Sequence, residues 1–153
     1  MKRTHADIYK VPDFSDSSSA YFAATVYADR VDILRSRARM LGGRDRAIMI
    51  MYLDKGNSIA QIARVAGVTE AVMSRRVRRL MARLIDNRFI LCLQHRDVFD
   101  PIEIDVAKDF FLIGRSLSTI SESRAISVYR IRKILAKIKA FKKRISKIRS
   151  RNV

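Results

Sequence analysis

Residues 56–80 read GNSIAQIARVAGVTEAVMSRRVRRL, and residues 114–138 read GRSLSTISESRAISVYRIRKILAKI. The second stretch begins 58 positions after the first, and few residues are identical, but apolar, small and hydroxyl residues occupy equivalent positions. Self-similarity at a fixed spacing is typical of a repeated structural unit. The equivalent pairs are Gly56 with Gly114, Ser58 with Ser116, Ile59 with Leu117, Ile62 with Ile120, Ala63 with Ser121, Gly67 with Ala125, Val68 with Ile126, Thr69 with Ser127, Met73 with Ile131, Val77 with Leu135, and Leu80 with Ile138.

The same spacing extends upstream of both stretches, so the repeat predicts a whole three- or four-helix unit rather than one motif. The alternative is a chance match between two amphipathic helical stretches, because apolar residues recur at similar spacing in any such helix. The upstream pairs are Arg30 with Arg88, Val31 with Phe89, Ile33 with Leu91, Leu41 with Phe99, Asp45 with Glu103, Ile48 with Val106, and Tyr52 with Phe110.

Helix start and stop signals divide the first copy of the repeat into four predicted helices. Small hydroxyl residues are placed to cap the helices, and glycines are placed to end them. The helices are residues 20–41, ended by Gly42 and Gly43; residues 45–55, ended by Gly56; residues 59–66, capped by Ser58; and a fourth that follows Gly67, is capped by Thr69 and buries Met73, Val77, Leu80 and Leu84.

The second copy has the same order of signals. Asp100, Pro101 and Glu103 supply a cap, a first-turn proline and a capping-box carboxylate, which together indicate a helix start. Two points stay open: residues 88–93 are apolar enough for a strand, and the helix from Glu70 has no clear stop. The predicted helices are residues 88–99, residues 101 to about 114, one capped by Ser116 and one capped by Ser127; the open join is at Asp86 and Asn87.

The composition argues against several classes of protein. With 153 residues, 48% of them apolar, the chain can bury a core. No run of about 18 apolar residues is present and residues 1–19 contain no apolar block, so we expect neither a membrane span nor a secretory signal. The single cysteine, Cys92, lies among apolar residues and is expected to be a buried thiol. Phosphate-loop, hydrolase-elbow and metalloprotease motifs are missing, so we expect no enzymatic activity, no cofactor and no metal site.

The charge of the chain is large and unevenly distributed. The 32 lysines and arginines outnumber the 15 acidic residues and give a net charge of +17, which favours a polyanionic partner. No acidic residue follows Glu122, so the attraction is concentrated in the second copy of the repeat and in the residues after it. The twelve basic residues in this part are Arg124, Arg130, Arg132, Lys133, Lys137, Lys139, Lys142, Lys143, Arg144, Lys147, Arg149 and Arg151.

Residues 62–75 resemble the helix-turn-helix of bacterial DNA-binding proteins. Ala63 is the small residue where two helices touch, Gly67 lies in the turn, Thr69 caps the second helix and Met73 locks it onto the first. The run AxxxGVT followed by VMSR is similar to repressor motifs, whereas GNSIAQIA and the helix before it are similar to the fourth, promoter-reading region of sigma factors. The resemblance covers residues 45–84 well and residues 103–138 less well, because there alanine replaces the turn glycine and serine replaces the small alanine.

This resemblance and the repeat together imply a fold class and a domain organisation. We expect an all-α protein with two tandem helix-turn-helix units related by an internal repeat of 58 residues. The expected parts are a flexible N-terminal arm over residues 1–17, a first unit over residues 18–85, a second unit over residues 86–141 and a basic extension of the last helix over residues 142–153.

The resemblance also implies that the second helix of each motif lies in the major groove of duplex DNA. Arg75 is the strongest base-reading candidate, because a guanidinium addresses guanine with two hydrogen bonds, whereas basic residues off that face position the protein on phosphates. The predicted base readers are Glu70, Ala71, Ser74, Arg75 and Arg78, and then Val128, Tyr129, Arg132 and Lys133. The predicted phosphate contacts are Arg64, Arg76, Arg79 and Arg83, and then Arg130, Lys137, Lys139, Lys142, Lys143 and Arg144.

The last predicted helix also carries a coiled-coil pattern. Its apolar residues alternate spacings of three and four, which is typical of a seam between two helices. Basic residues flank this seam, so a parallel homodimer would oppose like charges, and self-association through the last helix is a weak alternative. We expect the part up to Phe141 to pack on its own unit and the remainder to lie along DNA or to dock on an acidic protein. The seam is Ile131, Ile134, Ile138, Phe141, Ile145 and Ile148, flanked by Lys137, Lys142, Arg144 and Arg149.

The sequence therefore predicts a protein that binds double-stranded DNA with some sequence preference and acts as a transcription regulator or a sigma-like factor. Its expected location is the cytoplasm of a bacterial or phage-type system, associated with the nucleoid, and RNA polymerase or another acidic protein is a further expected partner. Two alternatives remain: the DNA-end recognition module of a transposase or recombinase, and a basic adaptor that docks an acidic protein.

Overall fold

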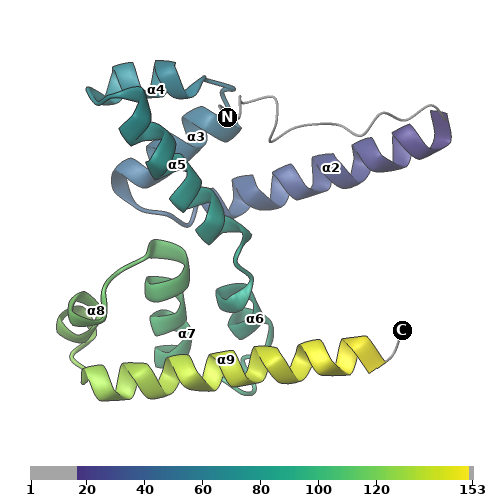
Figure 1. The fold of residues 1–153 in the computed structure, drawn as a ribbon. Coiled ribbons are helices and arrows are strands. Elements are labelled where there is room, and N and C mark those ends of the chain that lie inside the picture. Colours follow the sequence, from purple (N-terminus) through teal and green to yellow (C-terminus); the bar gives the residue numbers. More distant parts are fainter. Residues whose placement is uncertain (1–16, 152–153) are drawn as a thin grey trace. The chain divides into compact units, whose positions relative to one another are not determined.

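The computed structural model describes the backbone of residues 17–151 and the side chains of residues 28–151. All regular secondary structure in this part of the chain is helical, which confirms the predicted all-α class (Figure 1). The predicted arm over residues 1–17 lies outside the described residues except for Ser17, and so do residues 152 and 153 of the predicted extension.

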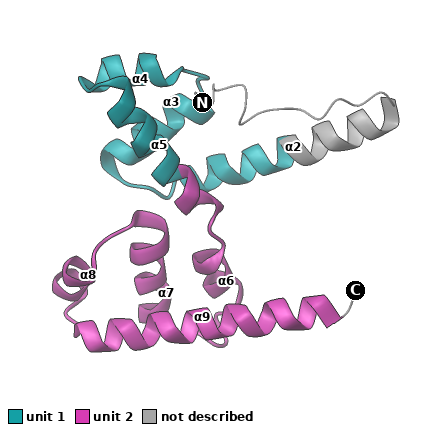
Figure 2. Cartoon of the chain, in the orientation of Figure 1, with its two compact units in different colours: residues 1–80 teal, residues 81–153 magenta. Residues whose placement is uncertain are grey.

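The chain divides into two compact units (Figure 2). Unit 1 ends at Leu80 and unit 2 begins at Met81. This boundary lies inside helix α5 (Glu70–Ile85), which therefore contributes residues to both units. The boundary predicted from the sequence, after residue 85, lies five residues later, at the end of α5.

Unit 1 contains α2 (Ser17–Ala38), α3 (Gly43–Leu53), α4 (Ile59–Ala66) and the first part of α5, and α3 packs against both α2 and α4. α2 ends before the predicted position at Leu41. The reason is that the N–H groups of Met40 and Leu41 bond to carbonyls three residues back, which closes the chain into a tight turn. Among residues 28–80, the buried apolar side chains of unit 1 are Ala38, Leu41, Ile48, Met49, Tyr52, Leu53, Ile62, Ala63, Met73, Val77 and Leu80.

Helix α3 is displaced by two residues from its predicted range of 45–55, since it begins at Gly43 and ends at Leu53. The N–H groups of Asp54 and Lys55 both bond to the carbonyl of Ile50, so the last turn closes before the predicted stop at Gly56. The predicted order of the elements is nevertheless unchanged.

The turn between α4 and α5 has the caps that the sequence predicts. The Ser58 hydroxyl oxygen accepts the N–H of Gln61 at 3.2 Å, and the Gln61 side chain accepts the N–H of Ser58 at 2.9 Å. α4 ends on Gly67, whose φ of 67° lies in the left-handed region that favours glycine. Thr69 Oγ1 then accepts the N–H of Val72 at 3.3 Å in the first turn of α5. These bonds fix the point at which α5 leaves α4.

Unit 2 contains the end of α5, then α6 (Arg88–Gln94), α7 (Pro101–Ala107), the π-helical turn η1 (Lys108–Ile113), α8 (Leu117–Arg124) and α9 (Val128–Arg151). α9 packs against α6, α7 and α8 (Figure 1). Its buried face closes the core of the unit, whose buried apolar side chains are Leu84, Phe89, Cys92, Phe99, Val106, Ala107, Phe111, Leu112, Ile120, Ile131, Ile134, Leu135, Ile138 and Phe141.

The chain is not helical at Asp86 and Asn87, so the helix from Glu70 does not continue into α6. Asp86 Oδ1 accepts the N–H of Arg88 at 2.9 Å, which satisfies a free donor in the first turn of α6. Residues 88–93 are helical, and the strand alternative for them is therefore wrong.

The predicted end of α6 at Phe99 is also wrong. α6 stops at Gln94, because the N–H groups of Val98 and Phe99 both bond to the carbonyl of His95 and residues 95–98 form a turn. This turn brings the buried ring of Phe99 edge-on to Phe141, with ring centroids 5.2 Å apart.

Helix α7 starts as the sequence predicts. The N–H of Asp100 donates to Glu103 Oε2 at 3.0 Å, and Pro101 occupies the first helical position. α7 then widens into η1, after which the N–H of Arg115 bonds to the carbonyl of Asp109 at 2.8 Å. The widened turn keeps Asp109 inside the unit, where it is 3% exposed.

Helix α8 ends on Ala125, which has a φ of 52° in the same left-handed region as Gly67. We expect Ala125→Gly to stabilise unit 2 by about 0.5–1 kcal/mol, because the left-handed strain of an L-residue, roughly 1–2 kcal/mol, exceeds the added entropy of glycine in the unfolded chain. Gly67→Ala should destabilise unit 1 by a similar amount. Urea unfolding followed by circular dichroism measures both changes.

Ala136→Gly is the matched control, since Ala136 is exposed in the interior of α9, where glycine costs about 1 kcal/mol. A loss of stability in Ala125→Gly equal to that in Ala136→Gly would show that Ala125 is not strained.

Asp86 gives unit 2 a stability term that depends on pH. Burial raises the pKa of Asp86, but hydrogen bonds from the side chain and backbone of Arg88 lower it more, so its pKa lies below the ordinary value of 3.8. The folded state therefore favours the ionised carboxylate, and its contribution is present above the unfolded-state pKa and lost as pH falls through the folded-state pKa. We expect Asp86→Asn to cost about 1 kcal/mol at neutral pH and the difference from the wild type to vanish below that pKa. Urea midpoints at several pH values measure it, and a constant difference across the range would contradict the assignment.

Candidate nucleic-acid interface

Helix α5 buries one face in the protein and exposes the other. Met73 and Val77 are buried, whereas Arg75, Arg78 and Arg79 are exposed and line one shallow hollow. The sequence assigned Arg75 and Arg78 to bases and Arg79 to phosphates, and the structure brings all three to the same surface. The result is a concentrated positive charge on the outer face of α5.

The other predicted base readers of α5 lie near its start. Glu70 and Ala71 are exposed in the first turn, and Ser74 is half-buried. Glu70 is placed at the helix N-terminus, where a carboxylate interacts favourably with the helix dipole. Its presence there is therefore consistent with a helix-stabilising role as well as with base contact.

An apolar groove beside α5 was missed in the sequence. Val65, Val68 and Val72 are 73%, 40% and 41% exposed, and all three line a groove formed by α3, α4 and the start of α5. Their spacing is the same as that of core residues, so no sequence signal distinguishes them. These exposed valines form an apolar strip next to the α4–α5 turn, in a groove that Arg44 and Arg76 also line.

Two of the predicted phosphate contacts on α5 are held by the protein itself. Arg76 donates to Asp45 Oδ1 through Nε at 2.9 Å and Nη2 at 2.8 Å, which ties α5 to α3. Arg83 Nη1 donates to the carbonyl of Ile113 at 3.1 Å, and its guanidinium lies over Gly114, where a Cβ would come within 2.2 Å of it. Arg64, by contrast, is exposed.

The first turns of α9 also present cations. Tyr129 is 67% exposed, and Lys133 Nζ lies 4.8 Å from the centre of its ring. Arg130 and Arg132 are exposed, while Val128 is half-buried. Tyr129, Lys133 and Arg132 therefore form an exposed aromatic and cationic surface at the start of this helix.

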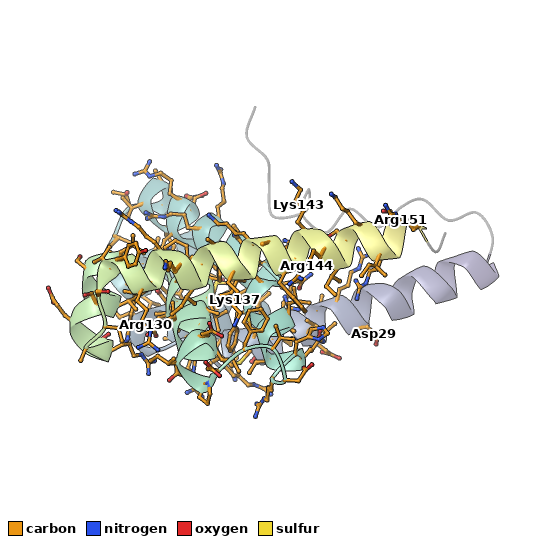
Figure 3. All side chains as sticks on the ribbon, turned by 90° about the horizontal axis from the view of Figure 1, so that it is seen from below. Asp29, Arg130, Lys137, Lys143, Arg144 and Arg151 are labelled. Atoms are coloured by element: carbon orange, nitrogen blue, oxygen red, sulfur yellow. The ribbon has the colours of Figure 1, made fainter. Side chains whose placement is uncertain are left out.

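Lys137, in the middle of α9, is held internally like Arg76. Its Nζ donates to Glu103 Oε2 at 2.7 Å and to the carbonyl of Val98 at 3.0 Å, and it lies 5.1 Å from the ring centre of Phe99. It thus joins α9 to α7 and to the turn before α7. Figure 3 shows the cations that follow one another along the length of α9. The further predicted phosphate contacts Lys139, Lys142, Lys143 and Arg144 are exposed.

The buried carboxylate of Asp109 joins η1 to α8, the helix that precedes α9. Asp109 accepts Arg124 Nε at 2.9 Å and Arg115 Nη1 at 3.3 Å, and Arg124 also donates to Asp105 Oδ2 at 2.8 Å. The hydrogen bond to Asp109 raises the pKa of Arg124 above its ordinary value. No pattern in the sequence indicated this network, because it joins residues of η1 and α8 whose contact depends on the π-helical geometry of η1.

Ser121 stabilises the α8–α9 turn with its hydroxyl group, which Ala63, at the equivalent position of the predicted repeat, lacks. Its hydroxyl donates to the carbonyl of Ile126 at 2.6 Å, across the left-handed residue Ala125. Ser116 and Ser127 accept the N–H groups of Thr119 and Arg130, each at 3.2 Å, so both predicted caps are confirmed.

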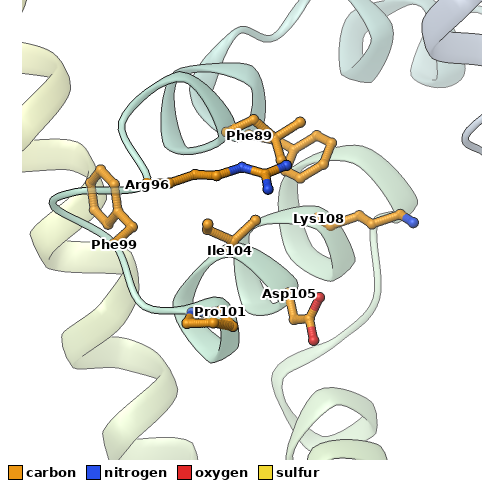
Figure 4. Close-up of a pocket in the computed structure, with 8 residues that line it drawn as sticks. Phe89, Arg96, Phe99, Pro101, Ile104, Asp105 and Lys108 are labelled. Carbon is orange, nitrogen blue, oxygen red and sulfur yellow. The ribbon is translucent and has the colours of Figure 1, made fainter.

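An open pocket lies between α6, the turn after it and α7 (Figure 4). Its walls are mainly apolar, and the side chain of Arg96 extends across it toward Phe89. Asp105, which also lines the pocket, pairs with Arg124. The lining residues are Phe89, Leu93, Arg96, Phe99, Pro101, Ile104, Asp105 and Lys108.

Cys92 is completely buried in unit 2, as the sequence predicts. Burial raises the pKa of its thiol to about 11, so the group stays protonated at neutral pH. Within residues 28–151, no group of three or more His, Cys, Asp and Glu side chains is arranged to hold a metal ion. None of the helices in the described part of the chain is long and apolar enough to cross a bilayer.

No family model matches the chain, and comparisons with curated proteins and with solved structures find no significant match.

Proposed function

We propose that this protein binds duplex DNA with sequence preference, through α5 and the first turns of α9, and acts as a transcription regulator or sigma-like factor. In this proposal the chain is a tandem pair of helix-turn-helix units related by the 58-residue repeat. A helix that buries one face and presents cations on the other fits the major groove, which admits one α-helix.

The helix boundaries support the proposed repeat. Three pairs of helices start at positions separated by the same 58 residues. The pairs of first residues are Gly43 and Pro101, Ile59 and Leu117, and Glu70 and Val128.

The turns between the paired helices support it as well. In the first turn, Gly67 is left-handed and the N–H of Val68 bonds to the carbonyl of Ala63 at 3.0 Å. In the second, Ala125 is left-handed and the N–H of Ile126 bonds to the carbonyl of Ser121 at 3.3 Å. A left-handed residue recurs at the predicted position even where the residue is not glycine, so equivalent positions carry the same backbone conformation.

The observation that carries the proposal is the cationic outer face of the second helix in each pair. On α5 this face holds Arg75, Arg78 and Arg79 around one hollow. On α9 it starts with the exposed pair Tyr129 and Lys133. Guanidinium groups can address guanine with two hydrogen bonds, and exposed cations off the centre of the face suit phosphates.

The internal bonds of the remaining cations suggest a supporting role for them. Arg76 joins α5 to Asp45 of α3, and Lys137 joins α9 to Glu103 of α7, so each connects the proposed recognition helix of its unit to an earlier helix. We therefore expect them to set the orientation of the proposed recognition helices. Arg64, Arg79, Arg130 and Lys139 are the exposed candidate phosphate contacts before Phe141, and Lys142, Lys143 and Arg144 are further candidates in the part of α9 after it.

A selection from random duplex oligonucleotides with the purified protein tests the proposal. Enrichment of one site with two conserved half-sites is the expected result, because both units would then read DNA. Enrichment of a single half-site would restrict base reading to one unit. Recovery of unselected sequence with no enrichment would contradict sequence-preferring binding.

The salt dependence of binding is a separate prediction. We expect the affinity for duplex DNA to fall roughly a thousandfold between about 50 and about 200 mM salt, as for a protein that neutralises about six phosphates. Fluorescence anisotropy of a labelled duplex measures the affinity. Binding that does not weaken as salt rises would favour the adaptor alternative instead.

A further inference from the structure

The last ten residues of α9, residues 142–151, form a distal segment in which every side chain except that of Ile145 is exposed. At 1.5 Å per residue this segment extends α9 by about 15 Å beyond Phe141, the last buried residue of the helix. In the described part of the chain, the ion pair nearest to the C-terminus is that of Lys137. No ion pair of the described residues involves a charge of the distal segment, although the charge of Lys142 helps to lower the pKa of Asp86 and the Arg144 guanidinium lies 5.6 Å from the ring centre of Phe141.

The distal segment continues the apolar seam of the unit 2 core. Phe141 is 8% exposed, Ile145 is half-buried and Ile148 is 56% exposed, so the seam leaves the core gradually and ends in solvent. These residues follow Ile138 with spacings of three, four and three, which is the heptad pattern of a helix that packs against another helix. Hydrophobic burial of Ile145 and Ile148 requires an apolar surface, which a phosphate backbone does not offer.

The charges beside this seam identify the kind of helix that fits. Positions next to the seam in a coiled coil form the ion pairs that select the partner. In the distal segment these positions hold Lys142, Arg144, Arg149 and Arg151, all of them basic. Arg144 and Arg151 are labelled in Figure 3. A second copy of α9 would place like charges opposite one another, whereas a helix with glutamates at these positions would pair with each of them.

We propose that the distal segment of α9 is a docking surface for an acidic amphipathic helix of another protein. The seam residues Ile145 and Ile148 would bury the partner's apolar stripe, and the flanking arginines would pair with its carboxylates. This inference goes beyond DNA binding and does not depend on it, because the surface lies outside the first turns of α9.

The test uses the full-length protein and a designed three-heptad peptide with leucine at the seam positions and glutamate at the flanking ones. Fluorescence anisotropy of the labelled peptide should show saturable binding. Ile148→Ser should weaken this binding about tenfold, because serine cannot bury the apolar surface that the isoleucine side chain buries against the peptide. Because Ile148 is exposed in the free protein, this variant should fold like the wild type, which circular dichroism checks.

Two controls separate helix docking from general attraction to a basic protein. A peptide of the same charge with serine in place of leucine should bind at least about tenfold more weakly, because its apolar stripe is gone. The variant with Arg144→Glu, Arg149→Glu and Arg151→Glu should lose the acidic peptide and bind the matching peptide with lysine at the flanking positions. Such a charge swap requires specific pairing.

Three results would overturn the inference. Equal binding of the leucine and serine peptides would show attraction by charge alone. A loss of duplex DNA affinity in Ile148→Ser without a loss of peptide affinity would assign the segment to DNA. A concentration-dependent dimer that Ile148→Ser abolishes would assign it to a second copy of the chain. If the peptide binds as expected but duplex DNA does not bind anywhere, the proposed DNA-binding function fails while this inference stands.

Discussion

Arg75→Ala is expected to reduce discrimination between the selected duplex and a duplex changed at the contacted base by about tenfold or more. A guanidinium that makes two hydrogen bonds to guanine contributes roughly 1–3 kcal/mol of discrimination, and alanine makes neither bond. Arg75 is exposed on the face of α5 opposite to the buried residues Met73 and Val77, so its removal leaves the core unchanged. The loss should therefore be one of specificity and not of folding.

Arg79→Ala is the matched control for this prediction, because Arg79 lines the same hollow and carries the same charge. If it contacts phosphate, its loss should weaken binding to all duplexes alike and reduce the slope of affinity against salt by about one unit. Arg75→Lys should retain the charge but not the paired hydrogen bonds, and should lose discrimination like alanine. Anisotropy with the selected duplex and single-base variants measures all three. Identical profiles for Arg75→Ala and Arg79→Ala would contradict the division of roles on α5.

Asp109→Ala is expected to destabilise unit 2 by about 3 kcal/mol, the scale seen when one partner of a buried ion pair is removed. Asp109 is 3% exposed and accepts hydrogen bonds from both Arg115 and Arg124. Without it, Arg124, whose side chain is only 29% exposed, keeps Asp105 as its remaining carboxylate partner. The ion pair between Arg124 of α8 and Asp109 of η1 would then be lost.

Urea unfolding monitored by circular dichroism measures this loss, with Asp105→Asn as the control. Asp105 is 47% exposed and pairs with the same arginine, so its replacement should cost less than about 1 kcal/mol. Equal costs for the two variants would show that burial of Asp109 does not matter. Asp109→Asn should lie between them, because an amide can still accept one hydrogen bond but provides no charge.

Local chemistry made several elements predictable from the sequence. Ser58, Ser116 and Ser127 cap helices as predicted, since a hydroxyl before an apolar stripe has few other local uses. α4 has the predicted bounds, and Cys92 is buried as its apolar neighbours indicate. These features depend on contacts between residues close in sequence or on the simple alternation of apolar and polar residues.

Contacts between residues far apart in sequence were not predictable in the same way. Arg76 and Lys137 were both predicted to contact phosphates. No feature of the sequence indicated that Arg76 would pair with Asp45 or that Lys137 would pair with Glu103. The early ends of α2 and α6 depend on turn hydrogen bonds that an apolar stripe does not reveal. The sequence therefore predicts which face of the helix is exposed, but not which cations form ion pairs within the protein.

The buried thiol of Cys92 can report how often unit 2 opens. It is the single cysteine of the chain and has no exposed surface in the folded state, so a thiol reagent can react with it only after unit 2 opens. The labelling rate of this sulfur therefore measures the opening of unit 2 alone, because the described part of unit 1 contains no cysteine. A duplex or a peptide that holds unit 2 closed should lower this rate.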